Sequence, residues 1–209
     1  MTENEKILAG LLKGVQSWED LKPKLSEHNT SITDTTTKTT LAGKLFEYFA
    51  KYFFKADATQ NQLYTDVWLY DEVDSLTKQE LGLPAKDKGV DLLLKDRQGR
   101  FYVVQCKFKN NEESVVNFGK DKIANTFFWA KKCFGVILFT NVSDCTDDIK
   151  NEKNFNAIKS DTLLNLDSSF FSSILNYIGI PLANPFIFYS IVRHNFAVAV
   201  LLLHLFYGR

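Results

Sequence analysis

Three polar side chains in one short stretch are the residues of this sequence best suited to chemistry. Asp91 stands at the start of one apolar run, and Gln105 and Lys107 stand two residues apart near the end of the next. Burying an acid or a lysine costs free energy unless the group has a partner or a task. An acid that binds Mg²⁺, an amide beside it and a lysine that stabilises negative charge are together what metal-dependent phosphodiester hydrolysis requires.

The turn between the two apolar runs decides whether these side chains meet. Side chains alternate across a strand, so Gln105 and Lys107 share one face of the second strand. Asp96 favours the start of a type I turn, and Gly99 can adopt the left-handed conformation that closes a three-residue loop. This loop places Asp91 opposite Gln105 at roughly 5 Å, with Lys107 as a diagonal neighbour. A two-residue loop would turn Asp91 to the opposite face.

Each of the three side chains then has a task. Asp91 supplies oxygen ligands for Mg²⁺, with Mn²⁺ as a substitute, and the ion lowers the pKa of a bound water. Gln105 offers a carbonyl or an amide donor beside the ion, and Lys107 orients the attacking water or stabilises the phosphate. The alternative is a buried Asp91–Lys107 ion pair with Gln105 as its hydrogen-bond partner. Because Asp91, Gln105 and Lys107 would lie on one face of the hairpin, a functional site is favoured over the ion pair.

This pattern resembles the PD-(D/E)XK nuclease superfamily in its Q-x-K form, and within it the Mrr-like restriction endonuclease domains. The matching parts are Gly-Val-Asp at residues 89–91, a spacer of 13 residues, and Gln-Cys-Lys at residues 105–107. Residues 43–47 resemble the family's first helix, which carries an acid, and residues 135–141 resemble the strand after its second helix. The resemblance covers about residues 40–145.

The resemblance implies an α/β fold with a restriction-endonuclease-like core, in which a central mixed β-sheet is flanked by helices. It also implies Mg²⁺-dependent cleavage of DNA. Asp91 would then be a metal ligand, Gln105 the residue nearest the metal and Lys107 the catalytic lysine. Glu47 would be the helical acid that helps to hold metal or water. Glu47 equally fits a surface ion pair with Lys51, one turn further along the same helix.

Charge is unevenly spread along a chain whose formal net charge is zero. Residues 86–132 carry 11 Lys or Arg against 6 Asp or Glu, a net charge of +5, whereas residues 1–85 carry 9 against 13, a net of −4. The positive balance lies on the segment that holds the candidate site, which suits contact with DNA phosphates. A charged run is more commonly a solvated surface. The candidate DNA contacts are Lys88, Lys109, Lys120 and Lys122.

At 209 residues, the length predicts one domain of ordinary size. We expect an N-terminal helical segment and Thr-rich linker over residues 1–40, the nuclease domain over 41–180 and an apolar tail over 181–209. The tail contains Arg193 near its middle, which makes membrane spanning costly. Packing against the domain, a missing downstream partner and a frame-disrupted end are the alternatives for it.

Periodicity and capping residues predict the elements around the hairpin. Helices are expected over residues 4–28, with breaks near Gly14 and Pro23, and over residues 41–55, after a cap at Thr39 or Thr40. Two further helices are expected over residues 115–132 and 167–178. Residues 75–81 are expected to form a helix or a loop. The expected strands outside the hairpin span residues 67–70 and 135–140. Residues 127–129, Phe-Phe-Trp, are expected to pack in the core.

Cysteine usage argues against a metal or disulfide framework. The chain has three cysteines, Cys106, Cys133 and Cys145, an odd number without C-x-x-C spacing. This pattern indicates a reducing, cytoplasmic compartment, and no signal peptide is evident at the N-terminus.

Two functions from different classes are compatible with the sequence. The first is a Mg²⁺-dependent DNA endonuclease, either free-standing or the nuclease part of a larger helicase-nuclease. The chain itself contains no G-x-x-x-x-G-K-[ST] phosphate loop of a motor. The second is a nucleic-acid-binding or docking module without cleavage. The expected partners are DNA and either a second copy of the chain or a helicase motor, and a membrane is not expected.

Overall fold

All four predicted strands belong to one five-stranded mixed sheet, and a fifth, unpredicted strand completes it. The computed structural model describes residues 1–28, 35–111 and 113–180. Within these ranges the strands are β1 (Tyr64–Leu69), β2 (Leu92–Asp96), β3 (Phe101–Lys107), β4 (Gly135–Thr140) and β5 (Phe155–Ile158), in this spatial order. Strands β1, β2 and β3 are antiparallel, whereas β3, β4 and β5 are parallel. The predicted α/β architecture is confirmed.

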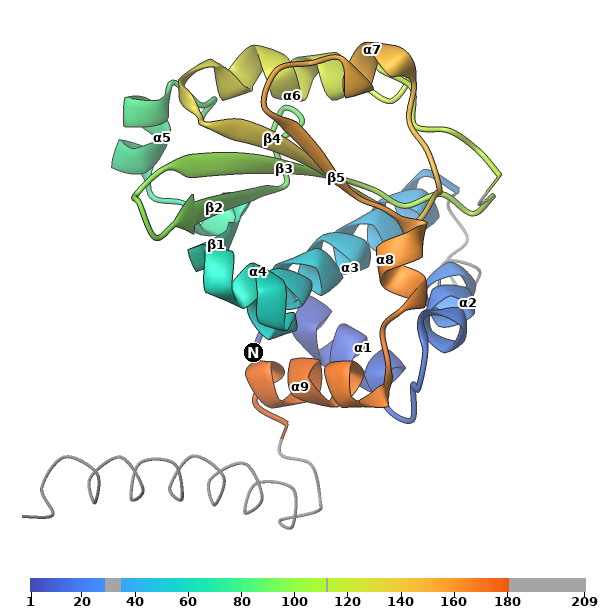
Figure 1. Cartoon of the computed structure of the whole chain (residues 1–209). Helices are drawn as coiled ribbons and strands as arrows, with labels where there is room; N and C mark the ends of the chain where they lie inside the picture. Colours follow the sequence, from blue (N-terminus) through green and yellow to red (C-terminus); the bar gives the residue numbers. More distant parts are fainter. Residues whose placement is uncertain (29–34, 112, 181–209) are drawn as a thin grey trace, which may run out of the picture. The chain divides into compact units, whose positions relative to one another are not determined.

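Helices cover both faces of this sheet (Figure 1). Their bounds are α1 (Glu3–Leu12), α2 (Trp18–His28), α3 (Thr35–Ala56), α4 (Ala58–Leu63), α5 (Ser75–Leu81), α6 (Ile123–Trp129), α7 (Asp147–Lys150), α8 (Ser160–Leu164) and α9 (Ser168–Ile178). Helices α5, α6 and α7 lie over one face, and α3 lies against the other, with α1 and α9 packed beyond it (Figure 1). Residues 1–179 form one unit, whereas the predicted apolar tail, residues 181–209, lies outside the described residues.

The hairpin of β2 and β3 has the predicted turn and register. The amide of Asp96 donates to the carbonyl of Arg100 at 2.9 Å, and Gly99 has φ +79°. A three-residue loop therefore connects the strands, and Leu93 lies opposite Val103 as expected. Because the register is constant along the hairpin, this turn determines which face every polar side chain occupies.

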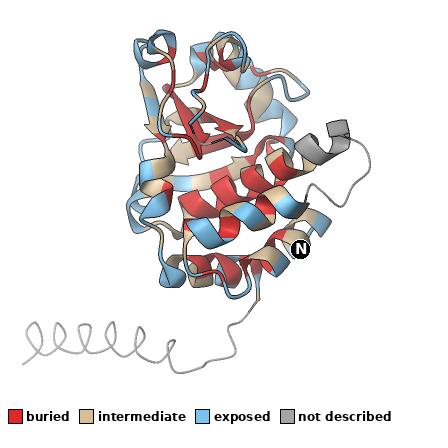
Figure 2. Cartoon of the chain, turned by 90° about the vertical axis from the view of Figure 1, so that its right-hand side faces the viewer, coloured by how far each residue is buried: buried red, intermediate tan, exposed pale blue. Residues whose placement is uncertain are grey.

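A phenylalanine-rich layer joins α3 to the sheet. Phe46, Phe49 and Phe53 of α3 are fully buried, and their ring centroids lie 5.1, 6.1 and 5.2 Å from the ring of Phe139 in β4. Figure 2 shows the buried residues running along the middle of α3 and through the strands. These rings form the apolar face of the helix, and the layer fixes α3 against the sheet.

Two predicted features of the N-terminal region are wrong. Helix α3 begins at Thr35, so neither Thr39 nor Thr40 caps it. Threonine lowers helix propensity by only a few tenths of a kcal/mol, and extending a packed helix is easier than starting one. The predicted break at Gly14 occurs, with φ +72°, but Pro23 lies inside α2. Buried Leu21 and Leu25 on either side hold that helix together through packing.

The predicted helix over residues 115–132 is much shorter than expected. Residues 115–122 form turns in which the side chain of Asn117 accepts from the amides of Gly119 and Lys120. An Asn that binds the following amides competes with helix formation. Helix α6 starts only at Ile123, after Lys122 with φ +61°. None of the described helices is long and apolar enough to cross a membrane.

Replacement of Phe139 tests the phenylalanine-rich layer. We expect Phe139→Ala to lower the free energy of unfolding by about 3–5 kcal/mol, because the cavity is surrounded by rings that cannot collapse into it. Urea unfolding followed by circular dichroism measures the loss. Phe128→Ala is the matched control, because that ring is 56% exposed, and it should cost less than about 1 kcal/mol. Equal losses in the two variants would contradict the assigned core.

Candidate active site

Asp91 is held in an extended backbone just before β2. Its amide donates to the carbonyl of Val104 in β3 at 2.9 Å, and its carbonyl accepts from the amide of Tyr70 at 2.9 Å. The residue is therefore bonded to neighbours on both sides, as a residue of a central strand would be. This places its side chain next to Gln105, near the end of β3.

The carboxylate of Asp91 is buried and accepts two hydrogen bonds at the same oxygen. Both Nε2 of Gln105 and the amide of Cys106, at 2.6 Å, donate to Oδ2. Asp91 is 6% exposed and Gln105 4% exposed, so this contact is shielded from water. The predicted pairing of Asp91 with Gln105 is confirmed. No described residue donates a hydrogen bond to Oδ1 of Asp91, the oxygen left for a ligand.

Thr126 of α6 packs against Gln105, and sequence reasoning missed it. The fully buried Oγ1 of Thr126 lies 2.5 Å from the carbonyl oxygen of Gly89 and 3.1 Å from Oε1 of Gln105. A hydroxyl carries one hydrogen, and the shorter contact assigns it to the carbonyl of Gly89. Thr126 therefore packs against the amide of Gln105, and the carboxylate of Asp91, which needs a donor, faces the amide nitrogen. In this arrangement Gln105 orients the carboxylate, and direct metal binding by its oxygen, which stays a prediction, requires the amide to turn over.

Gly89 permits this close packing. It has φ +103°, and a Cβ there would lie 3.2 Å from Oε1 of Gln105 and 3.3 Å from Cβ of Asn125. A side chain would therefore be strained by the backbone conformation and would crowd the amide. Asp87 makes the preceding turn by accepting from the amides of Gly89 and Val90 at 2.7 and 3.0 Å. The backbone at Gly89 therefore approaches the site closely.

Glu47 lies on α3, on the face of the sheet that this helix covers, and lines a cavity with Asp91. Its carboxylate pairs with Lys44 at 2.8 Å, and burial raises its pKa despite that partner. The alternative surface pair of Glu47 with Lys51 is wrong, because Lys51 is buried and binds Oε1 of Glu72. Sequence spacing alone could not distinguish the two lysines, since both lie within a helical turn of Glu47.

Two cavities meet at the candidate residues. The first, of about 490 Å³, is lined by Glu47, Asp91, Gln105 and Lys107 together with Asp121 and further residues of the β3 end. The second, of about 630 Å³, shares Asp91, Gln105 and Lys107 and extends toward α6. These three shared residues therefore lie between the two cavities, and Lys107 is the most exposed of them.

The predicted lysines differ in their surroundings. The ammonium group of Lys107 makes no hydrogen bond or ion pair with any described residue, although the residue lines both cavities. Lys88 and Lys122 line the second cavity, and Lys109 lines the first, where its ammonium bonds to Asp121. Lys120 is exposed and lines neither cavity. The structure thus brings three of the four candidate DNA contacts to the site.

The electrostatics of the two acids fit a divalent cation. Burial raises the pKa of Asp91 well above its ordinary value, and the charges of Glu47 and Asp87 add to this effect. The amide of Cys106 and the charge of Lys107 oppose it. Among the described residues no three His, Cys, Asp or Glu side chains are arranged to hold a metal. Mg²⁺ needs only one or two carboxylates, with water and substrate phosphate as its other ligands, so Asp91 and Glu47 suit it.

A mixed sheet with this acid, glutamine and lysine on one hairpin defines a restriction-endonuclease-like domain. Residues 55–151 match the Mrr_cat_2 family of restriction endonucleases. This segment, just under half of the chain, contains Asp91, Gln105 and Lys107 but not Glu47. The resemblance to Mrr-like restriction endonuclease domains is thus confirmed for it.

Other comparisons are more distant. No curated protein matches the chain. A solved structure, described as the ATP-dependent Type ISP restriction-modification enzyme LlaBIII bound to DNA, is similar at 23% identity with a TM-score of 0.46. The similarity covers 63% of this chain and 8% of that one, so the chain spans a small part of that enzyme.

Replacing Asp91 with Asn tests the cost of burying the charge. The raised pKa means that the folded protein holds the Asp91 proton more tightly than the unfolded chain does. The free energy of unfolding therefore falls as pH rises from about 4, the ordinary Asp pKa, toward the raised value. Asn avoids this loss, and its Oδ1 can accept from the same donors.

We expect urea unfolding in EDTA to show Asp91→Asn more stable than the parent at pH 8. The difference should shrink toward zero below about pH 3, where the carboxyl is neutral in both states. Each unit by which the pKa of Asp91 is raised corresponds to about 1.4 kcal/mol of difference in the free energy of unfolding between the two proteins at high pH. A variant that is less stable than the parent at pH 8 would contradict the assigned electrostatics.

Proposed function

We propose that this protein is a metal-dependent endonuclease that hydrolyses phosphodiester bonds of DNA, with Mg²⁺ as its cofactor and Mn²⁺ as a substitute. One observation carries the proposal. A buried acid, Asp91, is oriented by Gln105 beside the uncommitted ammonium group of Lys107, where two open cavities meet. The match of this segment to a restriction endonuclease family supports the same chemistry.

The two acids would hold the metal. Asp91 and Glu47 both line the first cavity, and the charge of Glu47 adds to the rise in the pKa of Asp91. Mg²⁺ bound there would supply an activated water and stabilise charge on the phosphate. Gln105 keeps Oδ2 of Asp91 engaged, which leaves Oδ1 for the cation. Lys44 compensates the charge of Glu47 until the cation is bound.

Lys107 is the group that would act on the phosphate directly. Its ammonium carries three donors, and none is used by the described residues. A positioned donor that meets charge as it develops stabilises a transition state more than the ground state. Lys107 can therefore bind a non-bridging phosphate oxygen or orient the attacking water.

The surroundings suit a polyanion. Lys88 and Lys122 line the second cavity, and Lys109 lines the first. Lysines in both cavities allow the phosphates that flank the scissile bond to be held at once. The same chemistry serves a free-standing nuclease, a homodimer that cuts both strands, and the nuclease part of a helicase-nuclease. Three free cysteines suit the reducing cytoplasm, where we place it.

Cleavage of supercoiled plasmid tests this function. We expect the purified protein to nick the plasmid with Mg²⁺ or Mn²⁺ and to lose this activity in EDTA. Lys107→Met, which keeps the length of the side chain, should lower the nicking rate by about 100-fold or more. Lys95→Met is the matched control on the same hairpin, because Lys95 packs over the ring of Phe101 and lines neither cavity.

Nicking that persists in EDTA, or that survives Lys107→Met, would contradict the proposal. Salt-sensitive DNA binding without nicking in either metal would favour the nucleic-acid-binding or docking module instead.

A further inference from the structure

Phe128 is an exposed aromatic residue on the wall of the second cavity. It is 56% exposed, whereas Phe127 before it is packed in the core against Phe118 and Phe155, at 5.8 and 6.1 Å between ring centroids. The prediction that residues 127–129 all pack in the core is therefore wrong for Phe128. Burying its ring would be favourable, and the protein does not bury it.

Trp129 stands edge-on to Phe128 in the same cavity wall. The two ring centroids lie 4.9 Å apart with their planes at 87°. Trp129 is partly buried against the core beneath α6, so it is anchored. The pair thus forms a supported aromatic surface that opens into the cavity.

This aromatic surface is continuous with the candidate active site. The cavity that Phe128 and Trp129 line also contains Asp91, Gln105 and Lys107. A molecule whose phosphate lies at Lys107 would extend its neighbouring groups along this wall. Two apolar rings next to the phosphate site suit a flat apolar group attached to that phosphate.

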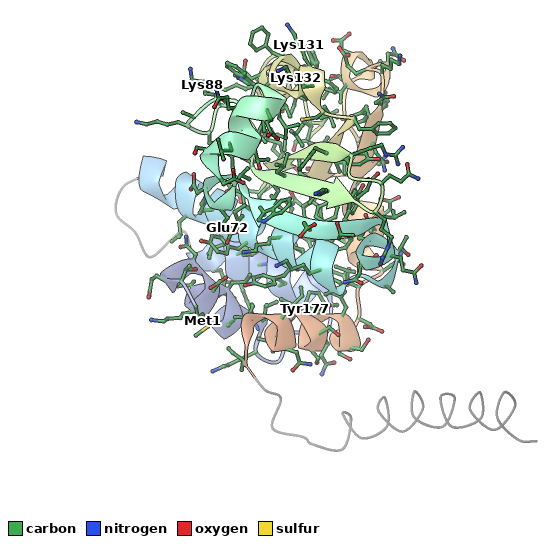
Figure 3. The ribbon with its side chains drawn as sticks, turned by 90° about the vertical axis from the view of Figure 1, so that its left-hand side faces the viewer. Met1, Glu72, Lys88, Lys131, Lys132 and Tyr177 are labelled. Atoms are coloured by element: carbon green, nitrogen blue, oxygen red, sulfur yellow. The ribbon has the colours of Figure 1, made fainter. Side chains whose placement is uncertain are left out.

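The rim of the surface is positively charged. The ammonium of Lys88 lies 5.8 Å from the ring of Trp129, and that of Lys131 lies 4.4 Å from the ring of Phe128. Lys122 lines the same cavity. Figure 3 shows Lys88, Lys131 and Lys132 gathered at one end of the molecule, away from Met1 and Tyr177. Proteins that bind single-stranded nucleic acid combine aromatic rings, on which bases stack, with positive charges that contact the phosphates. The wall of the second cavity has both features.

We propose that Phe128, supported by Trp129, stacks against an unpaired DNA base next to the scissile phosphate. This inference rests on the proposed function, and it makes single-stranded DNA, or a duplex with a displaced base, the preferred substrate. In an intact duplex each base is stacked on its neighbours and cannot offer its face to Phe128. Lys88 and Lys122 would hold the phosphates on either side of the stacked base.

Binding measured without cleavage tests the inference separately from the nuclease activity. A fluorescently labelled single-stranded oligonucleotide and its duplex are titrated with the whole protein in EDTA, and anisotropy gives both dissociation constants. We expect tighter binding of the single strand, and quenching of tryptophan fluorescence as Trp129 is covered. Phe128→Ala should weaken single-strand binding by about 5- to 100-fold and leave duplex binding almost unchanged.

Two matched variants separate stacking from general effects. Phe128→Leu keeps an apolar side chain but has no ring, so it should behave like Phe128→Ala, whereas Phe128→Trp should bind as the parent does. Phe134→Ala removes a ring that is also exposed but lies against Arg100, and it should not change binding. Thermal unfolding of each variant shows that the fold is intact.

The outcomes distinguish this inference from the proposed function. Parental single-strand affinity in Phe128→Leu, or an equal loss in Phe134→Ala, would overturn the stacking role even if plasmid is nicked. Ring-dependent single-strand binding by a protein that nicks nothing would support the stacking surface and reject the nuclease. Equal affinity of the parent for single strand and duplex would also overturn the inference.

Discussion

The hydrogen bond from Gln105 to the buried carboxylate of Asp91 is the interaction on which the site depends. A carboxylate away from water is unfavourable unless donors or a cation compensate it. Two donors, the side-chain amide of Gln105 and the backbone amide of Cys106, meet one of its oxygens, and Thr126 packs against the amide of Gln105. Burial still raises the pKa of Asp91, so the metal-free site is under-compensated. A divalent cation, as proposed, would compensate the charge of such a site and lower its free energy.

The rest of the fold supplies the geometry of this interaction. The three-residue turn at Gly99 sets the register that ends with Leu92 opposite Val104, and the side chain of Asp91 just before it meets Gln105. Backbone bonds from Tyr70 and to Val104 hold Asp91 in place. The phenylalanine-rich layer fixes α3, so Glu47 lines the same cavity from another element. Local turn chemistry and long-range packing therefore contribute one acid each. The second cavity, with Phe128 at its wall, extends the site along α6.

The hairpin could be predicted from the sequence because residues close together in the chain determine its structure. Period-two alternation and the turn at Gly99 determine the register without reference to the rest of the fold. The resemblance to Mrr-like domains used those same residues. Thr126 could not be found in this way, because its contact with Gln105 depends on where α6 crosses the sheet. The partner of Glu47 was ambiguous for a related reason, since Lys44 and Lys51 are equally close along the helix and only tertiary packing separates them. Phe128 was placed in the core because periodicity within an aromatic run does not reveal which ring faces out.

The most direct measurement is the thermal stability of the parent and of Asp91→Asn with increasing Mg²⁺, read against the same titration with Na⁺ at equal ionic strength. A ligand that binds only the folded protein stabilises it by about 2.7 kcal/mol at a concentration 100 times its dissociation constant. The account predicts a saturable rise in the melting temperature of the parent, and a rise in Asp91→Asn no larger than that with Na⁺. Equal responses of the two proteins to Mg²⁺, or no specific response of the parent, would contradict a cation site at Asp91.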